Sequence, residues 1–346
     1  MTGWRVGLLY DLKQNIPADA DVPSDALAEY DSIETVQGIE DALLAGQNEV
    51  IPLEGDHTLL DTLRAHNPDI CFNICEGRQG DARESQVPAL LEFLGIPYTG
   101  SKILANALSL DKAMAKRVWR DCGLPTPSFQ VFQSDAEALA PALDVPLFVK
   151  PLREGSGMGI SAGSVIHDRA ALREQVRYII RSYRQPALVE TFLPGREFTV
   201  GLIGNSPYSG LLPPSDLYAD CEVHVFPVLE VDVSPVAGAG GLYGSHIKVD
   251  FPLGPNYLCP APIEEELSQE MQRLALAAFQ AIGALDIARV DFRLDADGLP
   301  HLLEINTLPG LNPTYSDIVI AARAEGMHYT DLINAVLRVA AARYCL

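Results

Sequence analysis

Residues 150–161 read KPLREGSGMGIS and directly follow the apolar run VPLFV at 145–149. The three glycines and two serines of this stretch predict a mobile loop after a buried strand. The loop matches neither the P-loop pattern, GxxxxGK followed by Ser or Thr, nor the dinucleotide fingerprint GxGxxG. Its backbone N–H groups, together with Lys150 and the upstream Lys112, suit a flap over phosphate oxygens. An ordinary flexible hairpin loop would also explain the glycines.

The composition limits the class of protein. A chain of 346 residues is long enough for two or three compact units. Its formal net charge of −21, with no basic stripe in any segment, excludes nucleic acid and a membrane surface as partners, although a few local cations can still hold small anions. We find no signal peptide, no apolar run that could span a bilayer, and no CxxC pair among the six cysteines. These features predict a soluble protein of the cytoplasm, where thiols stay reduced.

The first hundred residues alternate between strand and helix patterns. Short apolar runs predict strands at 4–10, 49–53, 69–74 and 96–100. The helical spacing of apolar residues predicts helices at 29–45 and 84–95. This order predicts a parallel sheet with right-handed crossovers, which is a Rossmann-like unit over residues 1–100.

Two further units are expected, at 101–194 and 195–346. In the second unit the pattern predicts helices at 107–123 and about 169–183, and a strand at 187–193. In the third unit it predicts a strand at 195–204, loop and edge structure in the Pro- and Gly-rich passage 205–262, and a helix at 263–283.

Residues 288–306 read ARVDFRLDADGLPHLLEIN and predict a β-hairpin. Alternation places apolar side chains on one face of the first strand and charged side chains on the other. The pair Asp297-Gly298 is a strong signal for a two-residue turn. A turn one residue longer would shift the register of the two strands.

A two-residue turn makes Asp291 face Glu304 and Arg289 face Asn306. Opposed carboxylates repel each other, so this pair predicts a bound cation. A small set of ligands, all of them oxygen atoms, favours Mg²⁺. A solvated strand face with unrelated charges is the alternative interpretation.

Five motifs in this chain resemble, in sequence order, those of the ATP-grasp superfamily and, within it, of the D-alanine–D-alanine ligase group. The motifs are LGIPYTGS (94–101), LDKAMAK (110–116), KPLREGSGMG (150–159), VETFLPGREFTVGLIG (189–204), and RVDFRLDADG with LLEINTLPGLNP (289–313). The resemblance covers roughly residues 70–340, and several long motifs in the right order are highly specific. It implies an α/β ATP-grasp fold of three subdomains, in which the N-terminal Rossmann-like unit is the pre-ATP-grasp domain.

The resemblance also implies the residues that bind ATP and metal. The phosphate and flap contacts are Lys112, Lys150, Glu154, Gly155, Ser156 and Gly157. The hinge and ribose contacts are Glu190, Phe192, Leu193 and Glu197. The metal ligands are Asp291, Glu304 and Asn306, in agreement with the hairpin register. The implied cofactors are ATP and two Mg²⁺ ions, with Mn²⁺ as an alternative.

The implied reaction is an ATP-dependent, ADP-forming condensation of a carboxylate with an amine. The carboxylate attacks the γ-phosphate of ATP to give an acyl phosphate, and the amine then displaces phosphate. Arg289 and the backbone N–H of Gly310 would steady the tetrahedral oxyanion, Lys248 would contact the transferred phosphate, and Ser156 belongs to the flap's catalytic network. The implied partners are amino acids and ATP, and a homodimer is usual in proteins that the chain resembles.

Two alternatives stay open: a nucleotide-binding regulator without turnover, and a ligase of a specialised pathway that uses a non-standard amino acid or another carboxylate. Retention of Arg289, Lys248 and all three metal ligands argues against the regulator. The LEINTLPGLNP segment argues against a kinase or carboxylase-type member, because its resemblance includes the amine-substrate end.

The amino-acid half of the pattern departs from the family. The first strand leads into LLYDLKQN in place of a Gly-Gly and Ser-x-Glu signature, and residues 76–85 read EGRQGDARES in place of His-Gly-x-x-Gly-Glu-Asp-Gly. Val249 follows Lys248 where the family usually has a tyrosine. The candidate substrate contacts are Glu76 to an ammonium, Arg78 to a carboxylate, Tyr10 and Asp11 just past the first strand, and Ser316 or Tyr315 to the second carboxylate.

Overall fold

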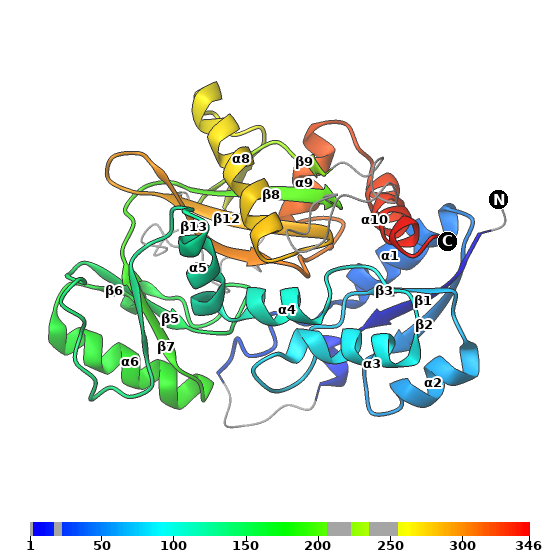
Figure 1. Ribbon diagram of the computed structural model, residues 1–346, viewed down its shortest axis with the longest axis horizontal. Coiled ribbons are helices and arrows are strands. Elements are labelled where there is room, and N and C mark those ends of the chain that lie inside the picture. Colours follow the sequence, from blue (N-terminus) through cyan, green and yellow to red (C-terminus); the bar gives the residue numbers. More distant parts are fainter. Residues whose placement is uncertain (1–2, 17–22, 206–222, 235–254) are drawn as a thin grey trace.

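The computed structural model describes residues 3–16, 23–205, 223–234 and 255–346. Within these ranges the strands form three sheets flanked by helices (Figure 1). Lys248, Val249 and most of the Pro- and Gly-rich passage lie outside the described residues. Among the described helices, none is long and apolar enough to cross a membrane.

The first sheet is parallel, with strand order β2-β1-β3. The elements of this part are β1 (Arg5–Tyr10), η1 (Lys13–Asn15), α1 (Ile33–Ala45), β2 (Glu49–Glu54), α2 (Leu59–His66), β3 (Ile70–Asn73), η2 (Arg83–Ser85) and α3 (Gln86–Leu94). The predicted start of the first helix at residue 29 is wrong, because the Ser32 hydroxyl caps α1 by accepting from Thr35 N–H. The predicted strand at 96–100 is reduced to one bridge, between Cys71 and Tyr98.

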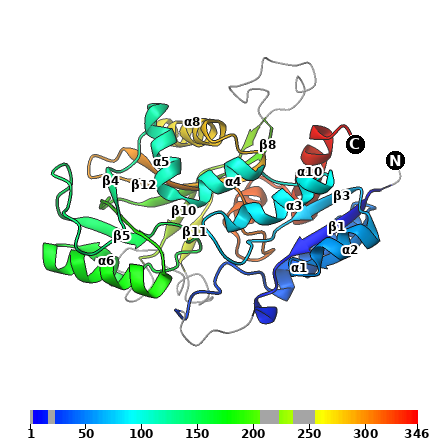
Figure 2. The ribbon, with the colours of Figure 1, turned by 60° about the horizontal axis from the view of Figure 1, so that its bottom comes forward.

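The second sheet is antiparallel, with strand order β4-β7-β5-β6. The elements of this part are α4 (Ile103–Leu110), α5 (Lys112–Asp121), β4 (Phe129–Phe132), β5 (Leu147–Pro151), η3 (Ala162–Ser164), β6 (Val165–Ile166), α6 (Arg169–Tyr183) and β7 (Ala187–Thr191). The predicted bounds of α6 are confirmed, and this helix packs against the sheet (Figure 2).

The predicted single helix at 107–123 is wrong, because the chain leaves helical geometry at Asp111. The backbone of Asp111 is extended, and its side chain caps α5 by accepting from Met114 N–H at 3.0 Å. This break makes Lys112 the first residue of α5, with its side chain directed to the junction of the second and third sheets.

The third sheet has strand order β11-β10-β8-β12-β13, and β9 pairs with β8. Its elements are β8 (Glu197–Gly204), β9 (His224–Val225), β10 (Leu229–Asp232), β11 (Asn256–Leu258), α8 (Glu265–Ala281), β12 (Asp286–Leu294), β13 (Pro300–Asn306), α9 (Asp317–Ala324) and α10 (Tyr329–Arg343). Helices α5 and α8 share one apolar core with β8, β12 and β13. Helices α9 and α10 share another core with α1, so the C-terminal helix joins the N-terminal unit to this sheet (Figure 1).

The hairpin of β12 and β13 confirms the predicted pairing at its charged positions. Arg289 is opposite Asn306, and Asp291 is opposite Glu304. The apolar side chains of β12 are buried, whereas its charged side chains face the opposite side of the sheet.

The predicted two-residue turn at Asp297-Gly298 is nevertheless wrong. The strands are joined by the loop 295–299, in which Asp295 N–H donates to the carbonyl of Leu299. The longer loop shifts the register near the tip, and a β-bulge between Asp291 and Phe292 shifts it back. The longer loop and the bulge shift the register in opposite directions, so the charged residues are paired as the two-residue turn predicted.

Asp286, the first residue of β12, connects the N-terminal unit to the third sheet. Its buried carboxylate accepts from the N–H of Gly100 at 2.9 Å, from Asn205 Nδ2 at 2.9 Å and from Arg343 Nη2 at 2.6 Å. Arg343 also donates to the carbonyls of Tyr98 and Gly100. One carboxylate and one guanidinium thus hold three distant segments together.

We expect Arg343→Ala to lower the free energy of unfolding by about 3–5 kcal/mol, because it leaves a buried carboxylate without its cation. Burial raises the pKa of Asp286 above its usual value even with Arg343 in place. Urea denaturation followed by circular dichroism measures the loss. Arg338→Ala, an exposed change on the same helix, is the matched control and should shift the free energy by about 0.5 kcal/mol or less. Equal effects of the two changes would contradict this account.

Candidate active site

A cleft with an empty volume of about 950 Å³ is lined by residues of both the second and the third sheet. One end is apolar: the rings of Phe148 and Phe192 stack with a centroid separation of 6.5 Å, and Leu193 lines the wall beside them. Arg293 lies over Phe192 and pairs with Glu197 at 3.1 Å. An apolar wall with a few converging polar groups is typical of a small-molecule site.

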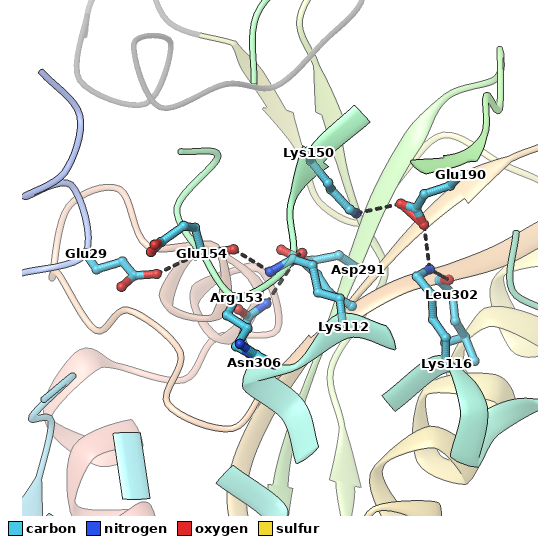
Figure 3. A network of polar contacts seen from close by, with 12 residues as sticks. Glu29, Lys112, Lys116, Lys150, Arg153, Glu154, Glu190, Asp291, Leu302 and Asn306 are labelled. Atoms are coloured by element: carbon cyan, nitrogen blue, oxygen red, sulfur yellow. Dashed lines mark hydrogen bonds and ion pairs between the residues drawn. The ribbon is translucent and has the colours of Figure 1, made fainter. Parts of the chain in front are cut away.

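The polar end of the cleft contains Glu190, held between two lysines (Figure 3). Lys150 Nζ lies 2.8 Å from Glu190 Oε1, and Lys116 Nζ lies 2.9 Å from Glu190 Oε2. Burial alone would raise the pKa of Glu190, but the two ammonium groups outweigh it and lower that pKa. Burial would lower the pKa of Lys150, but the carboxylates of Glu190 and Glu304 raise it. Glu190 and Lys150 are therefore both charged at neutral pH.

Asp291 is a hairpin carboxylate with both oxygen atoms hydrogen-bonded. Its Oδ1 accepts from Thr199 Oγ1 at 2.6 Å and from Arg289 Nε at 2.9 Å. Its Oδ2 accepts from Arg289 Nη2 at 2.9 Å and from Asn306 Nδ2 at 3.0 Å. Arg289 also lies 3.4 Å from Asp317, and these carboxylates outweigh burial and raise the pKa of its guanidinium well above the usual value.

Lys112 connects the hairpin to the flap. Its Nζ lies 3.4 Å from Glu304 Oε2 and donates to the carbonyl of Glu154 (Figure 3). The structure thus brings together the predicted cations of the second unit and the predicted carboxylates of the third. In the described ranges, no group of three or more His, Cys, Asp or Glu side chains is arranged to hold a metal ion. The predicted ligand set differs from such a group, because it has two carboxylates and one amide.

The flap, residues 154–159, contacts carboxylates of the N-terminal unit. Gly155 N–H donates to Glu29, and Gly159 N–H donates to Asp25 Oδ2 at 2.9 Å. A Cβ at position 155 would lie only 2.6 Å from Glu29 Oε1, so a larger residue there would push the Glu29 carboxylate away from the flap. The flap N–H groups therefore point at anionic oxygens, as expected of a phosphate-binding loop.

Arg83 joins the same contacts from the loop after β3. It lies 2.5 Å from Glu29 and 3.1 Å from Glu154, and it donates to the carbonyl of Arg153 at 2.8 Å. The sequence prediction assigned no role to Arg83, Glu29 or Asp25. All three lie outside the regular strands and α-helices. Glu29 falls in the predicted helix 29–45 and Arg83 in the segment 76–85, but neither pattern indicates that these side chains face the flap.

A second cavity, with an empty volume of about 590 Å³, adjoins the first. The residues that line both cavities include Lys112, Arg289 and Glu304. The predicted residues that line only the second cavity include Glu76, Gly155, Ser156, Asn306 and Gly310.

The N-terminal wall of this second cavity is lined by acidic residues. It contains Glu29, Glu76 and Glu84, of which the sequence predicted only Glu76. Burial, and then the charges of Glu29 and Glu84, raise the pKa of Glu76 well above its usual value. Burial, and then Glu29, raise the pKa of Glu84 to about 7. Glu84 lies in the segment 76–85 that departs from the family's loop pattern, and that departure did not show that its side chain would face this cavity.

The other N-terminal residues predicted to contact substrate do not line either cavity. Arg78 is exposed, and neither it nor Tyr10 is among the residues that line the two cavities. Asp11 is buried, and its Oδ2 accepts from Gly77 N–H at 3.0 Å, which positions the loop that carries Glu76.

Tyr315 and Ser316 also lie outside the lining of both cavities. Tyr315 is partly exposed, whereas Ser316 Oγ accepts from Asn312 N–H at 2.8 Å. That hydroxyl lies near Gly310, since a Cβ built there would be 3.2 Å from it. A role for either residue in binding the second substrate stays a prediction.

Residues 118–338 match the family model described as D-ala D-ala ligase C-terminus. A D-alanine–D-alanine ligase of Bordetella petrii is 34% identical over 342 residues, which cover 98% of this chain and 93% of that protein. The uncharacterized protein y4sG of Sinorhizobium fredii is 37% identical over 309 residues, which cover 86% of this chain and 84% of that protein. The crystal structure of a Bacillus anthracis D-alanine–D-alanine ligase complexed with ATP superposes with a TM-score of 0.73 at 21% identity, covering 99% of this chain and 100% of that chain.

The fold is thus that of the ATP-grasp enzymes, and the class is that of ATP-dependent, ADP-forming ligases. The chain belongs to the D-alanine–D-alanine ligase-like family. The predicted family, fold class and enzyme class are confirmed, and the regulator without turnover is not favoured.

Proposed function

We propose that this ligase joins two amino acids through an acyl-phosphate intermediate. One observation carries the proposal: Lys112, Arg289 and Glu304 line the wall common to both cavities. A triphosphate in the first cavity and a carboxylate in the second would meet at these charges. Such a reaction requires alignment, charge neutralisation and exclusion of water more than covalent help from the protein.

The proposed chemistry has two steps. An oxygen of the first substrate's carboxylate attacks the γ-phosphorus, the bond to the β–γ bridging oxygen breaks, and ADP leaves. The amine nitrogen of the second substrate then attacks the acyl carbon, loses a proton and forms the C–N bond as phosphate leaves. We assign Lys112, Lys150 and the flap N–H groups to the phosphates, with Arg289 and Gly310 N–H on the oxyanion. Lys248, on the transferred phosphate, lies outside the described residues.

The nucleotide base belongs, in this proposal, at the apolar end of the first cavity. Phe192 and Leu193 would contact adenine together with the backbone of Glu190, and Glu197 would accept from the ribose hydroxyls. All four residues line that cavity, which supports the assignment.

The hairpin is the proposed metal site. Asp291, Glu304 and the amide oxygen of Asn306 would hold Mg²⁺, and they fit this ion because all three are oxygen donors grouped on paired strands. They are too few to fill its coordination shell, so water and phosphate oxygens would complete it. Bound Mg²⁺ would neutralise phosphate charge. Two ions, with Mn²⁺ as an alternative, remain part of the proposal.

The identity of the amino acids is open between an ordinary cell-wall substrate and a non-standard amino acid of a specialised pathway. The acidic wall of Glu29, Glu76 and Glu84 is where this chain differs from the loop pattern that the family usually has, so a panel of amino-acid substrates is needed to separate the two candidates. We place the reaction in the cytoplasm because it consumes ATP and because the described cysteines are free thiols. A homodimer stays a prediction.

The test is a panel of D- and L-amino acids, assayed singly and in pairs with ATP and Mg²⁺. Release of ADP and phosphate together with a condensed product, identified by mass spectrometry, is the expected result. ATP binding without turnover on any carboxylate would instead favour the regulator.

We expect Glu76→Gln to raise the KM for the first amino acid by about 10- to 100-fold. The reason is the loss of a charge-assisted hydrogen bond between the Glu76 carboxylate and the ammonium group of that substrate. The KM for ATP should stay within about twofold, since Glu76 does not line the first cavity. Steady-state kinetics on the amino-acid pair found in the panel measures both constants. Asp81→Asn, on the exposed part of the same loop, is the control. An unchanged amino-acid KM would remove Glu76 from the substrate site.

A further inference from the structure

Lys116 is a completely buried cation that the proposed mechanism does not use. It follows Lys112 by one turn of α5, its side chain is 0% exposed, and within the described chain it lines neither cavity. Its Nζ lies 2.9 Å from Glu190 Oε2, donates to Thr126 Oγ1 at 2.9 Å, and donates to the carbonyl of Leu302 at 3.3 Å. Lys116 thus makes one ion pair, with Glu190, and two hydrogen bonds, with Thr126 and Leu302. Figure 3 shows its contacts with Glu190 and Leu302.

The partner of Lys116 has a second cation. Glu190 Oε1 lies 2.8 Å from Lys150 Nζ, and Lys150 lines the first cavity whereas Lys116 does not. The buried group of two lysines and one glutamate therefore carries a net charge of +1, and only one of its cations can reach a ligand. A buried ion pair of Lys150 and Glu190 alone would be neutral and would resist separation, because separation leaves an uncompensated carboxylate.

We propose that Lys116 is a positioning residue that retains the Glu190 carboxylate when Lys150 turns to the nucleotide phosphates. The inference rests on the part of the proposed function that assigns Lys150 to ATP. Lys116 keeps Glu190 neutralised in both states, so Lys150 exchanges one anionic partner for another without leaving a bare charge behind. The hydrogen bonds to Thr126 and Leu302 hold Lys116 in place during the exchange.

The protonation state of Lys116 agrees with this role. Burial lowers the pKa of its ammonium to about 8, against the attraction of Glu190. The group therefore remains mostly charged at pH 7, where the following measurements are made.

The experiment is isothermal titration calorimetry with Mg²⁺ and the non-hydrolysable ATP analogue AMP-PNP, in the absence of amino acids. We expect K116M to raise the Kd of the analogue by about 30-fold or more, the size of effect seen when a buried charge loses its partner. The decisive variant is the double change Lys116→Met with Glu190→Gln, which removes both charges and takes away the ion pair between Lys150 and Glu190. We expect its Kd to return to within about threefold of the wild type, because the Glu190 carboxylate then no longer competes with the phosphates for Lys150.

A purely structural role for Lys116 gives the opposite pattern, since a second buried change would add damage and weaken binding further. The inference is overturned by wild-type affinity in K116M or by a double variant that binds as weakly as K116M. If K116M fails to fold, the double variant alone decides, because it contains no unpaired buried carboxylate: wild-type-like binding supports the inference and weak binding overturns it. Wild-type protein that binds the analogue but turns over no amino acid would count against the proposed function alone.

Discussion

We expect the Glu304→Gln protein to fold normally and to turn over at least about 10³-fold more slowly than the wild type, because a proposed metal ligand loses its charge. The side chain of Glu304 is 20% exposed and lies 3.4 Å from Lys112, so the neutral amide can occupy the same space. ADP release, measured with the amino-acid pair identified by the panel, reports the rate. The Mg²⁺ concentration for half-maximal rate should also rise.

Asp297→Asn is the matched control for this change. Asp297 lies on the exposed tip of the same hairpin, away from both cavities, and its amide variant should retain the wild-type rate. Thermal unfolding of both variants checks the fold. A rate for Glu304→Gln within threefold of the wild type would count decisively against the metal assignment.

The second large effect concerns Arg289, whose guanidinium makes two bonds to Asp291 and lines both cavities. We expect Arg289→Lys to lower kcat by about 10²- to 10³-fold, the effect of removing one oxyanion donor. An ammonium keeps the charge but cannot reproduce the planar, two-pronged contact. The KM for ATP should change by less than about threefold, because the proposed role is in the transition state.

Arg273→Lys, on the exposed surface of α8, controls for the general effect of an arginine-to-lysine change. Pre-steady-state kinetics with a rapid quench separates the chemical step from product release. If the two variants have equal kcat values, Arg289 does not stabilise the transition state.

The hairpin illustrates how far the sequence predicts this fold. Strand alternation is a property of the backbone, so the buried and charged faces of β12 followed from the sequence alone. The turn could not be predicted in the same way. Asp297-Gly298 is a local signal for a two-residue turn, but the chain forms a five-residue loop that begins at Asp295. The bulge, where Leu303 of β13 is the extra residue opposite Asp291 and Phe292, is indicated by no local sequence pattern.

The candidate site likewise contains residues that the sequence predicts and residues that only the structure reveals. The lysines, the hairpin carboxylates and the flap lie within motifs, so sequence patterns found them, and the structure brings them to one junction. Glu29, Arg83 and Glu84 reach that junction only because α1 packs on α10 and because the loop after β3 turns toward the flap. Their positions depend on contacts between distant parts of the chain, which a single sequence does not display.

The bulge has a consequence for how the chain tolerates change. Beyond it, residues 296–299 at the tip of the hairpin are exposed, whereas before it β12 is paired with β8 from Asp286 to Asp291. A residue gained or lost at the tip can therefore be absorbed by a register adjustment at the bulge, as already occurs between the loop and Asp291. Natural variation in the length of this loop should leave the acidic pair undisturbed, while an insertion between Glu304 and Asn306 would rotate one ligand to the opposite face of the sheet.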